Sequence, residues 1–378
     1  MVQPIHILHL HSSFDLGGKE ARAVRLMNLF GDRARHTIVS GVPGQLGARA
    51  AIDSGIQHEI AQDPPPLTGR PSVARYEEIA RYMRRFDLVL TYNWGAIDGV
   101  MARRVFSKGV PPLVHHEDGF NADESGGLKA ERNVYRRIAL GAAYALVVPS
   151  QTLATIAQRV WRQPADRVYR IANGIDVDRY AIAPVARAIP GFRRKAGEVV
   201  VGTLAGLRTV KDLPMLVRAV GGVSGRVRLV IVGEGPERAN IEQAAKAMGL
   251  ADRFHLPGFL PDPSRFVGLF DICALSSRSE QFPISVVEAM AAGVPIAAPP
   301  VGDLRAMVSS ANAPFICEHH GEVFLRDAIQ KLVDNQDLRR VIGIANREKA
   351  RDEYGEAAMV AAYRRLYSAA IGKPGVFD

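Results

Sequence analysis

Short apolar segments alternate with longer segments of helical periodicity along the first half of the chain. Residues 5–10 form an apolar run that predicts a strand, and residues 20–30 follow with the spacing of an amphipathic helix. The alternation continues with predicted strands at 37–40, 88–91, 113–115 and 145–148 and predicted helices at 76–85, 98–106 and 128–140. Strands that alternate with helices favour a parallel sheet with right-handed crossovers. The first half therefore predicts an α/β fold.

The periodicity is lost after residue 173 and resumes near residue 199, which indicates two domains. Strands are predicted at 199–204, 227–232 and 254–256, and the last helical segment, 356–370, is amphipathic. A chain of 378 residues is long enough for two domains, each with its own core. We expect a first domain over 1–174, a linker over 175–198, a second domain over 199–354 and a C-terminal helix within 355–378.

The most informative segment of the second half reads as strand, loop, helix and strand. Residues 271–275 are apolar and predict a strand, and a polar loop follows. Pro283 suits the first helical position, where its missing N–H would have no partner. Residues 284–292 predict a helix that Gly293 ends, and 294–298 predict the next strand.

Two glutamates in this segment suggest a ligand site. The N–H groups at the helix start, around residues 284–286, can bind an anion. Glu288 lies little more than a turn further on and can reach a neutral group such as ribose hydroxyls, while Glu280 can reach the other side of the anion. A diphosphate between two sugars fits this layout. The alternative is that both glutamates are solvated surface residues.

The segment from Ser277 to Ile296 resembles the Glu-x7-Glu motif of family-4 retaining glycosyltransferases, which have the GT-B fold. The resemblance implies two Rossmann-like doubly wound domains, with a C-terminal helix packing back on the first. It implies sugar transfer from a nucleotide-sugar, such as a UDP- or GDP-sugar, to a saccharide or lipid-linked acceptor. Glu280 would lie near the donor sugar and Glu288 on the ribose. The other substrate-binding residues expected in this segment are Phe282, Pro283, Ile284, Ser285 and Val286.

Three segments of the first domain extend the resemblance. Gly17 and Gly18, between a strand and a helix, resemble the glycine-rich loop that faces the donor, although a plain turn fits these residues equally well. The segment at 114–120 resembles the one that carries an active-site histidine. Here that position is Asp118, and His116 lies two residues earlier, so either side chain is a catalytic candidate. Asn173, a substrate-binding candidate by resemblance, begins a motif that the family has at its interdomain hinge.

The second domain has a basic segment that resembles the family's diphosphate grip. Lys211 matches the family's lysine, whereas the arginine position holds Gly206, and Arg208 lies two residues on. In the family, these basic side chains supply the charge that a metal would otherwise provide, so no metal or other cofactor is expected. Further substrate-binding candidates by resemblance are Gly233, Gly258 and Phe259.

Charge and composition narrow the possible partners. The formal net charge is +9, and the basic residues cluster in the first half. Solvated helix faces are the default explanation. Among functional ones, an anionic membrane surface is preferred to nucleic acid, because no nucleic-acid-binding motif accompanies the charge. The clusters comprise Arg81, Arg84, Arg85, Arg103, Arg104, Arg132, Arg136, Arg137, Arg193, Arg194 and Lys195.

The remaining composition indicates a cytoplasmic protein, with possible peripheral attachment to the inner face of the cytoplasmic membrane. The two cysteines lie in apolar runs, which is typical of buried thiols in a reducing compartment. We recognise no signal peptide and no apolar run long enough to cross a bilayer. His9 and His11 are expected on one face of the first strand with His6 on the other, which argues against a three-histidine metal site.

Two alternatives remain at this point. One is another GT-B enzyme, such as a nucleotide-sugar epimerase or a sugar phosphorylase, against which the Glu-x7-Glu motif argues. The other is a non-catalytic subunit that binds a sugar nucleotide, which the departures at Asp118 and Gly206 favour.

Overall fold

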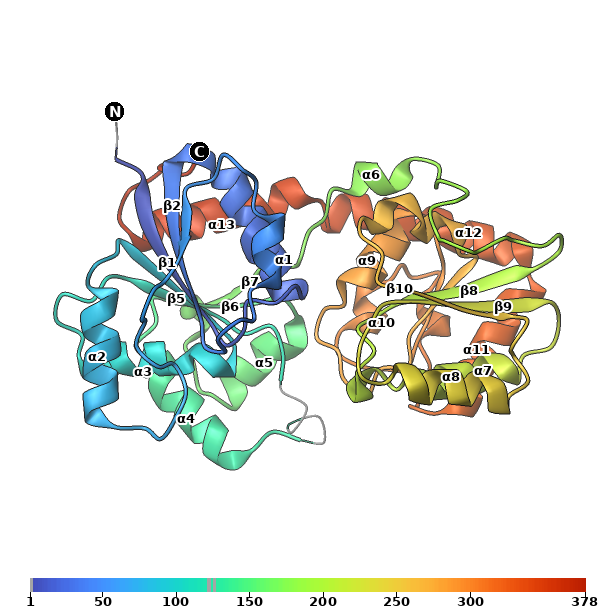
Figure 1. Cartoon of the computed structure of the whole chain (residues 1–378), viewed down its shortest axis with the longest axis horizontal. Coiled ribbons are helices and arrows are strands. Elements are labelled where there is room, and N and C mark those ends of the chain that lie inside the picture. The colour runs from blue at the N-terminus through green and yellow to red at the C-terminus, as the bar shows by residue number, and fades with distance from the viewer. Residues whose placement is uncertain (1–2, 121–123, 125–126) are drawn as a thin grey trace. The chain divides into compact units, whose positions relative to one another are not determined.

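The computed structural model describes residues 3–120, 124 and 127–378, and it divides into two compact units. Unit 1 comprises residues 1–173 together with 358–378, and unit 2 comprises residues 174–357. Each unit has its own parallel sheet with helices on its faces (Figure 1). The α/β architecture expected from the alternating pattern is therefore confirmed.

Unit 1 is built on a parallel sheet in the order β3-β2-β1-β4-β5-β6-β7. Most of these strands are buried on both faces, as expected when helices cover both sides of a sheet. The strands are β1 (Ile5–His11), β2 (Ala34–Ser40), β3 (His58–Ile60), β4 (Leu88–Tyr92), β5 (Leu113–His116), β6 (Ala145–Val148) and β7 (Val168–Arg170).

Helices cover both faces of the unit 1 sheet. Buried side chains of α1 and α13 pack on one face, and those of α2 and α3 pack on the other. The helices are α1 (Gly18–Phe30), α2 (Val73–Met83), α3 (Ile97–Val105), α4 (Ala130–Leu140), α5 (Gln151–Arg159) and α13 (Glu356–Ala370). Figure 1 shows α13 beside the first strands of unit 1 although it belongs to the end of the chain.

The C-terminal helix completes the core of unit 1, as the resemblance implied. Tyr363 and Tyr367 are fully buried, and they share a cluster with Phe30 of α1 and Leu90 of β4. The apolar face of this helix is covered by the sheet of unit 1, which is why the chain returns there after leaving unit 2.

Unit 2 contains a second parallel sheet, in the order β10-β9-β8-β11-β12. Helices α7, α8 and α11 contribute to one core cluster with its strands. The strands are β8 (Val199–Leu204), β9 (Val227–Val232), β10 (Phe254–Gly258), β11 (Ile272–Ala274) and β12 (Ile296–Ala297). The helices are α6 (Val177–Ala181), α7 (Leu213–Gly221), α8 (Arg238–Ala247), α9 (Ile284–Ala291), α10 (Leu304–Met307), α11 (Glu322–Asp334) and α12 (Gln336–Glu353).

The segment expected to be a linker, residues 175–198, packs as part of unit 2. It carries the short helix α6, and Ile189 and Phe192 within it are buried. The Val185 N–H donates a backbone hydrogen bond to the Arg265 carbonyl at 2.8 Å. Its apolar residues are too irregularly spaced to predict an element, yet the Phe192 ring lies beside His255 of β10, with ring centroids 6.1 Å apart.

Strand order reverses at one point in each sheet, and these points mark where ligands bind in open α/β folds. In unit 1, the reversal lies between β1 and β4, whose partners include Ile7 and Leu88. In unit 2, it lies between β8 and β11, with Val201 opposite Ile272. The loops after β1, β8 and β11, together with the helices α1 and α9 that follow the first and last of them, carry most of the residues expected at a site.

Candidate active site

The loops after β8 and β11 bring Lys211 and Glu280 into contact at the strand reversal of unit 2. Lys211 Nζ and Glu280 Oε1 form an ion pair, with side chains only 19% and 11% exposed. The Ser277 hydroxyl donates to the same Glu280 oxygen at 2.7 Å, and the Ser276 hydroxyl donates to the Lys211 carbonyl at 2.8 Å. The two serines hold both loops, so a cation and a carboxylate are fixed side by side.

Glu280 also depends on a glycine from a third loop. Gly302, after β12, has a φ of +56°, and a Cβ there would lie 2.2 Å from the Glu280 carbonyl oxygen. A side chain at this position would displace the Glu280 backbone. Gly302 is thus part of what positions Glu280, although nothing in the motif itself indicates this.

Arg208 lies over the position where the family has its arginine. The side chain is exposed, and a Cβ added to Gly206 would lie 3.3 Å from Arg208 Nε. The Arg208 guanidinium therefore occupies the space into which a side chain at residue 206 would begin to extend. Lys211 and Arg208 are joined by a turn, since the Lys211 N–H donates to the Arg208 carbonyl at 2.8 Å.

The loop after β9 lies directly against this basic segment. Gly233 has a φ of +152°, and a Cβ there would lie 1.9 Å from the Ala205 carbonyl oxygen. The Leu207 N–H donates to the Glu234 carbonyl at 2.9 Å. Gly233 is thus needed for the close approach of the two loops, and the loop after β9 supports the Arg208 segment. A direct contact of Gly233 with substrate stays a prediction.

The start of α9 offers fewer unoccupied N–H groups than the sequence suggested. Pro283 precedes the helix, and the Val286 N–H donates to the Pro283 carbonyl at 3.1 Å. This turn leaves the N–H groups of Ile284 and Ser285 as the candidates for an anion. Phe282 is buried and packs edge-on against Tyr354, with ring centroids 5.5 Å apart, so it supports the helix start from the core side.

Glu288 lies in a half-buried site one turn further along α9. Its Oε1 accepts a hydrogen bond from the Tyr180 hydroxyl at 2.9 Å. Burial raises the pKa of Glu288 from 4.5 to about 7; the Tyr180 hydrogen bond opposes this shift, and the nearby Asp262 carboxylate adds to it. Glu288 is therefore a carboxylate held in a poorly solvated position, where hydroxyl donors from a ligand would replace the missing water.

The end of β10 presents an aromatic side chain to solvent. Gly258 closes the strand, and its carbonyl accepts from the Gly233 N–H at 2.9 Å. Phe259, the next residue, is 60% exposed. The substrate-binding candidates Gly258 and Phe259 are thus next to the loop that contacts the Arg208 segment.

In unit 1, helix α1 and the loop after β5 meet at an ion pair, and its arginine also contacts the segment after β7. Arg22 of α1 binds Asp118 through both terminal guanidinium nitrogens, Nη1 to Oδ1 and Nη2 to Oδ2, the latter at 2.8 Å. Its Nη1 also donates to Asn173 Oδ1 at 2.9 Å. The Asp118 N–H donates to Asn93 Oδ1 at 2.7 Å. Asp118 and Asn173, both predicted site residues, are thus held by one guanidinium.

The electrostatics of this cluster keep Asp118 ionised. Burial alone would raise the pKa of Asp118, but the Arg22 guanidinium outweighs burial and the pKa lies below its usual value. Lys19 follows Gly17 and Gly18 at the start of α1 and pairs with Glu20. Burial lowers the pKa of Lys19 to about 8, which the Asp118 carboxylate partly offsets.

His116, two residues before Asp118, lies in the core of unit 1. It is buried, its Nδ1 lies 3.2 Å from the Thr91 carbonyl, and its Nε2 lies 2.8 Å from the Tyr367 hydroxyl of α13. Because both ring nitrogens have protein partners, this position favours a structural role. Asp118 is the better placed of the two candidates, at 13% side-chain exposure.

Two residues that the structure places in these sites, Arg22 and Tyr180, were not predicted from the sequence. Arg22 lies four residues before Leu26 on α1, so a charge interrupts an apolar stripe of the helix. That interruption was a usable signal for a buried ion pair. Tyr180 lies in a segment without periodicity, and we find no sequence signal that would have paired it with Glu288.

Other features of the described chain bear on the remaining expectations. Among residues 3–120, 124 and 127–378, no group of three or more His, Cys, Asp or Glu side chains could hold a metal ion. Within the same ranges, no helix has the length and apolarity to span a membrane.

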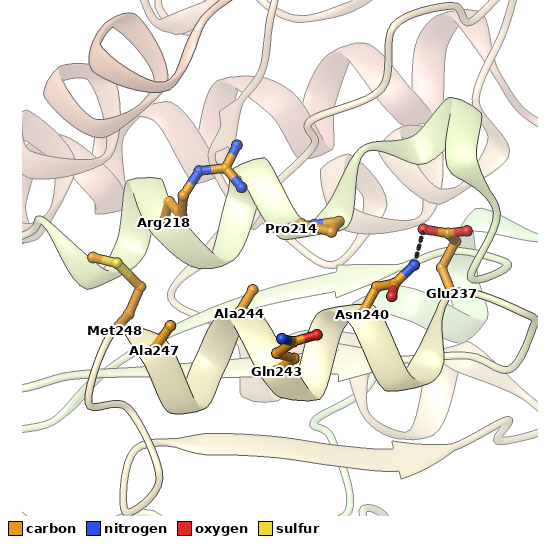
Figure 2. A pocket seen from close by; sticks show the side chains of 8 residues that line it. All are labelled: Pro214, Arg218, Glu237, Asn240, Gln243, Ala244, Ala247 and Met248. Carbon is orange, nitrogen blue, oxygen red and sulfur yellow. Dashed lines mark hydrogen bonds between the residues drawn. The ribbon is translucent and has the colours of Figure 1, made fainter.

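A shallow groove of about 450 Å³ lies between α7 and α8 (Figure 2), and its lining, which includes Arg218 and Asn240, contains none of the candidate site residues.

The chain is similar to known glycosyltransferases along almost its whole length. Residues 16–179 match the family "Glycosyltransferase Family 4", and residues 187–349 match "Glycosyl transferases group 1". The chain is 30% identical to the lipopolysaccharide core biosynthesis glycosyltransferase LpsD of Rhizobium meliloti, over 97% of this chain and 99% of that protein.

More distant similarities agree with these matches. The chain is 24% identical to the N-acetyl-alpha-D-glucosaminyl L-malate synthase of Bacillus anthracis, where the match spans about half of each protein, 54%. The structure of Anabaena HepE in complex with UDP-glucose superposes with a TM-score of 0.79 at 20% identity, over 97% of this chain and 100% of that one. With the two parallel sheets and the returning α13, these matches show that the chain belongs to glycosyltransferase family 4 and has the GT-B fold.

Proposed function

We propose that this glycosyltransferase moves a sugar from a nucleoside diphosphate sugar to an acceptor hydroxyl, with retention of the anomeric configuration. The observation that carries the proposal is the contact of Lys211 with Glu280 beside the start of α9, with Glu288 one turn further on the same helix. A cation, the N–H groups at the helix start and a carboxylate follow one another there, in the order that the diphosphate and ribose of such a donor would require.

We propose a uracil nucleotide as the donor, ahead of a guanine nucleotide. The support is indirect: HepE, which has the same fold, was solved with UDP and with UDP-glucose. The exposed Phe259 ring, next to Gly258, offers an apolar surface on which a base can rest.

The chemistry that we propose is a front-face displacement. The bond from the anomeric carbon to the diphosphate oxygen breaks, its electron pair leaves with the diphosphate, and the acceptor oxygen bonds to the same face of the carbon. The acceptor proton passes to the departing phosphate oxygen. Lys211, Arg208 and the N–H groups of Ile284 and Ser285 would stabilise the charge on that leaving group without a metal.

In this proposal Asp118 replaces the histidine that the family has at the corresponding position. Its ion pair with Arg22 fixes the carboxylate and keeps it an acceptor, so it can take a hydrogen bond from a hydroxyl of the donor sugar. A neutral histidine could either donate or accept. We therefore expect this position to influence which sugar is used.

A lipid-linked acceptor at an anionic membrane is the acceptor class that the surface of unit 1 supports best. Val134 and Ile138 lie four residues apart on α4 and are 57% and 48% exposed, with Arg137 beside them. Arg104 of α3 extends toward the end of α4, since a Cβ at Gly141 would lie 3.3 Å from its Nη1. Exposed apolar side chains framed by arginines match the interface of an anionic bilayer.

The test of the proposed reaction is turnover of candidate donors by the purified protein. UDP-glucose, UDP-galactose, UDP-N-acetylglucosamine and GDP-mannose would be incubated separately, with slow hydrolysis read as released nucleoside diphosphate. Release from at least one donor, lost in Lys211→Ala, is expected. Binding of a donor by calorimetry with no release from any, with or without added saccharide acceptors, would instead support a non-catalytic sugar-nucleotide-binding subunit.

A further inference from the structure

The short helix α6 places a hydroxyl group on the carboxylate that the proposed function assigns to ribose. α6 lies beside α9 in unit 2 (Figure 1). The Tyr180 hydroxyl donates to Glu288 Oε1 at 2.9 Å, across 108 positions of the sequence. Both side chains are half-buried, so water competes weakly for this bond.

No cation neutralises Glu288 in the part of the chain that the structure describes. The charged or titratable groups around it are Tyr180 from α6, Asp262 from the loop after β10, and Cys273 from β11. Asp262 is itself paired with Arg179 of α6, at 2.8 Å. The Tyr180 hydroxyl is thus the donor that holds Glu288, and the neighbouring carboxylate repels it.

We propose that Tyr180 is a positioning residue for nucleotide binding, whose hydroxyl fixes the Glu288 carboxylate so that its remaining oxygen lone pairs face the ribose. This inference rests on the proposed function, because it takes the ribose of a nucleotide as the ligand of Glu288. An ionised carboxylate accepts only, and a vicinal diol supplies two donors to it. The terminal torsion of a glutamate is broad, so a fixed partner on one oxygen restricts the orientation of the other.

The plain alternative is that the Tyr180 ring merely packs α6 on α9 and that its hydroxyl is incidental. Tyr180→Phe separates the two because it keeps the ring and removes only the oxygen. Tyr169→Phe is a matched control, since Tyr169 is an exposed tyrosine on β7 of unit 1. Circular dichroism and thermal melting of each full-length variant would establish that the fold is retained.

The experiment measures UDP and 2′-deoxy-UDP binding by calorimetry for the wild type, Tyr180→Phe, Glu288→Gln, the double variant and the control. We expect Tyr180→Phe to weaken UDP about tenfold, as loss of one hydrogen bond to a charged group would. We expect a smaller loss for 2′-deoxy-UDP, so the discrimination between the two narrows. In the Glu288→Gln background, the added Tyr180→Phe change should lower UDP affinity little further.

The pH dependence gives a readout that packing alone would not move. UDP affinity should fall as pH decreases and Glu288 becomes protonated. Because the Tyr180 hydrogen bond lowers the pKa of Glu288, its removal should move the midpoint of this fall to higher pH. In Tyr169→Phe the midpoint should stay where it is in the wild type.

Several outcomes would overturn the inference. Unchanged UDP affinity, discrimination and pH midpoint in Tyr180→Phe would mean that the hydroxyl positions nothing. An equal loss in the wild-type and Glu288→Gln backgrounds would mean that Tyr180 acts through another group. GDP and ADP would be titrated into the wild type as well; if it binds none of UDP, GDP and ADP, then the proposed donor class itself fails, and this inference fails with it.

Discussion

Unit 1 should lose stability in mild acid. His9, His11, His36 and His116 are buried in unit 1. Burial lowers the pKa of each, to about 3 for His36 and His116. In the unfolded chain these side chains protonate near pH 6.5, so below that pH the unfolded state binds more protons than the folded state. The resulting stability is complete above pH 6.5 and is lost as pH falls.

The size of the loss follows from these pKa directions. Each histidine that stays neutral in the fold costs about 1.36 kcal/mol per pH unit below 6.5, or about 2 kcal/mol at pH 5. The four together give an upper bound of about 8 kcal/mol, comparable with the roughly 5–15 kcal/mol that stabilises a typical domain. Burial raises the pKa of Asp98 in the same unit, which offsets part of the loss.

Intrinsic fluorescence can follow unit 1 by itself. The chain has two tryptophans, Trp94 and Trp161, and both belong to unit 1. Urea unfolding would be followed at pH 7.5, 6 and 5 by fluorescence and by circular dichroism, which reports both units. The fluorescence midpoint should fall steeply below pH 6.5. Unit 2 should not follow, because the raised pKa of Glu288 makes unit 2 more stable as pH falls from 7 toward 4.5.

A variant with one fewer buried imidazole tests whether the buried histidines cause the loss of stability of unit 1 in acid. His36→Gln should make the pH dependence of the fluorescence midpoint shallower by about a quarter, since one of four similar contributions is removed. If the fluorescence midpoint stays constant from pH 7.5 to 5, then buried neutral histidines do not govern the acid response of unit 1.

Four further outcomes are expected. Glu288→Gln should weaken UDP binding by calorimetry, yet raise the urea stability of the free protein at pH 8 by up to about 3 kcal/mol, because a poorly solvated charge is removed. Arg208→Ala and Lys211→Ala should each lower the preference for UDP over UMP about ten- to a hundredfold. Val134→Ser with Ile138→Ser should reduce flotation with anionic vesicles, and high salt should reduce it further. Excess chelator should leave turnover intact, because we expect Arg208 and Lys211, not a metal ion, to hold the diphosphate.

Each of these has a result that contradicts it. Unchanged UDP affinity in Glu288→Gln would remove that residue from the ribose site. A loss in Lys211→Ala alone would mean that Arg208 points to solvent. Val73→Ser, an exposed valine on α2, is the control for flotation, and equal binding to neutral vesicles would argue against a membrane surface. Loss of turnover in chelator that magnesium restores would show a metal requirement.

Local patterns were sufficient for most elements of both sheets. β1, β4 and β8 lie where apolar runs predicted strands, because strands buried on both faces need such runs whatever surrounds them. The helix after Pro283 was likewise predictable, since its start and end signals lie within a few residues of it. Glu280, Lys211 and Asp118 were found by resemblance to motifs whose members are close in sequence.

Tertiary structure decided the contacts between residues that are far apart in the chain. Arg22 meets Asp118 across 96 positions, and Tyr180 meets Glu288 across 108. Such pairs depend on strand order and on which loop follows which strand, and periodicity carries no information about either. The same holds for residues 175–198, within which Ile189 and Phe192 are buried in unit 2 and Phe192 lies beside His255 of β10, a neighbour that only the folded chain brings near.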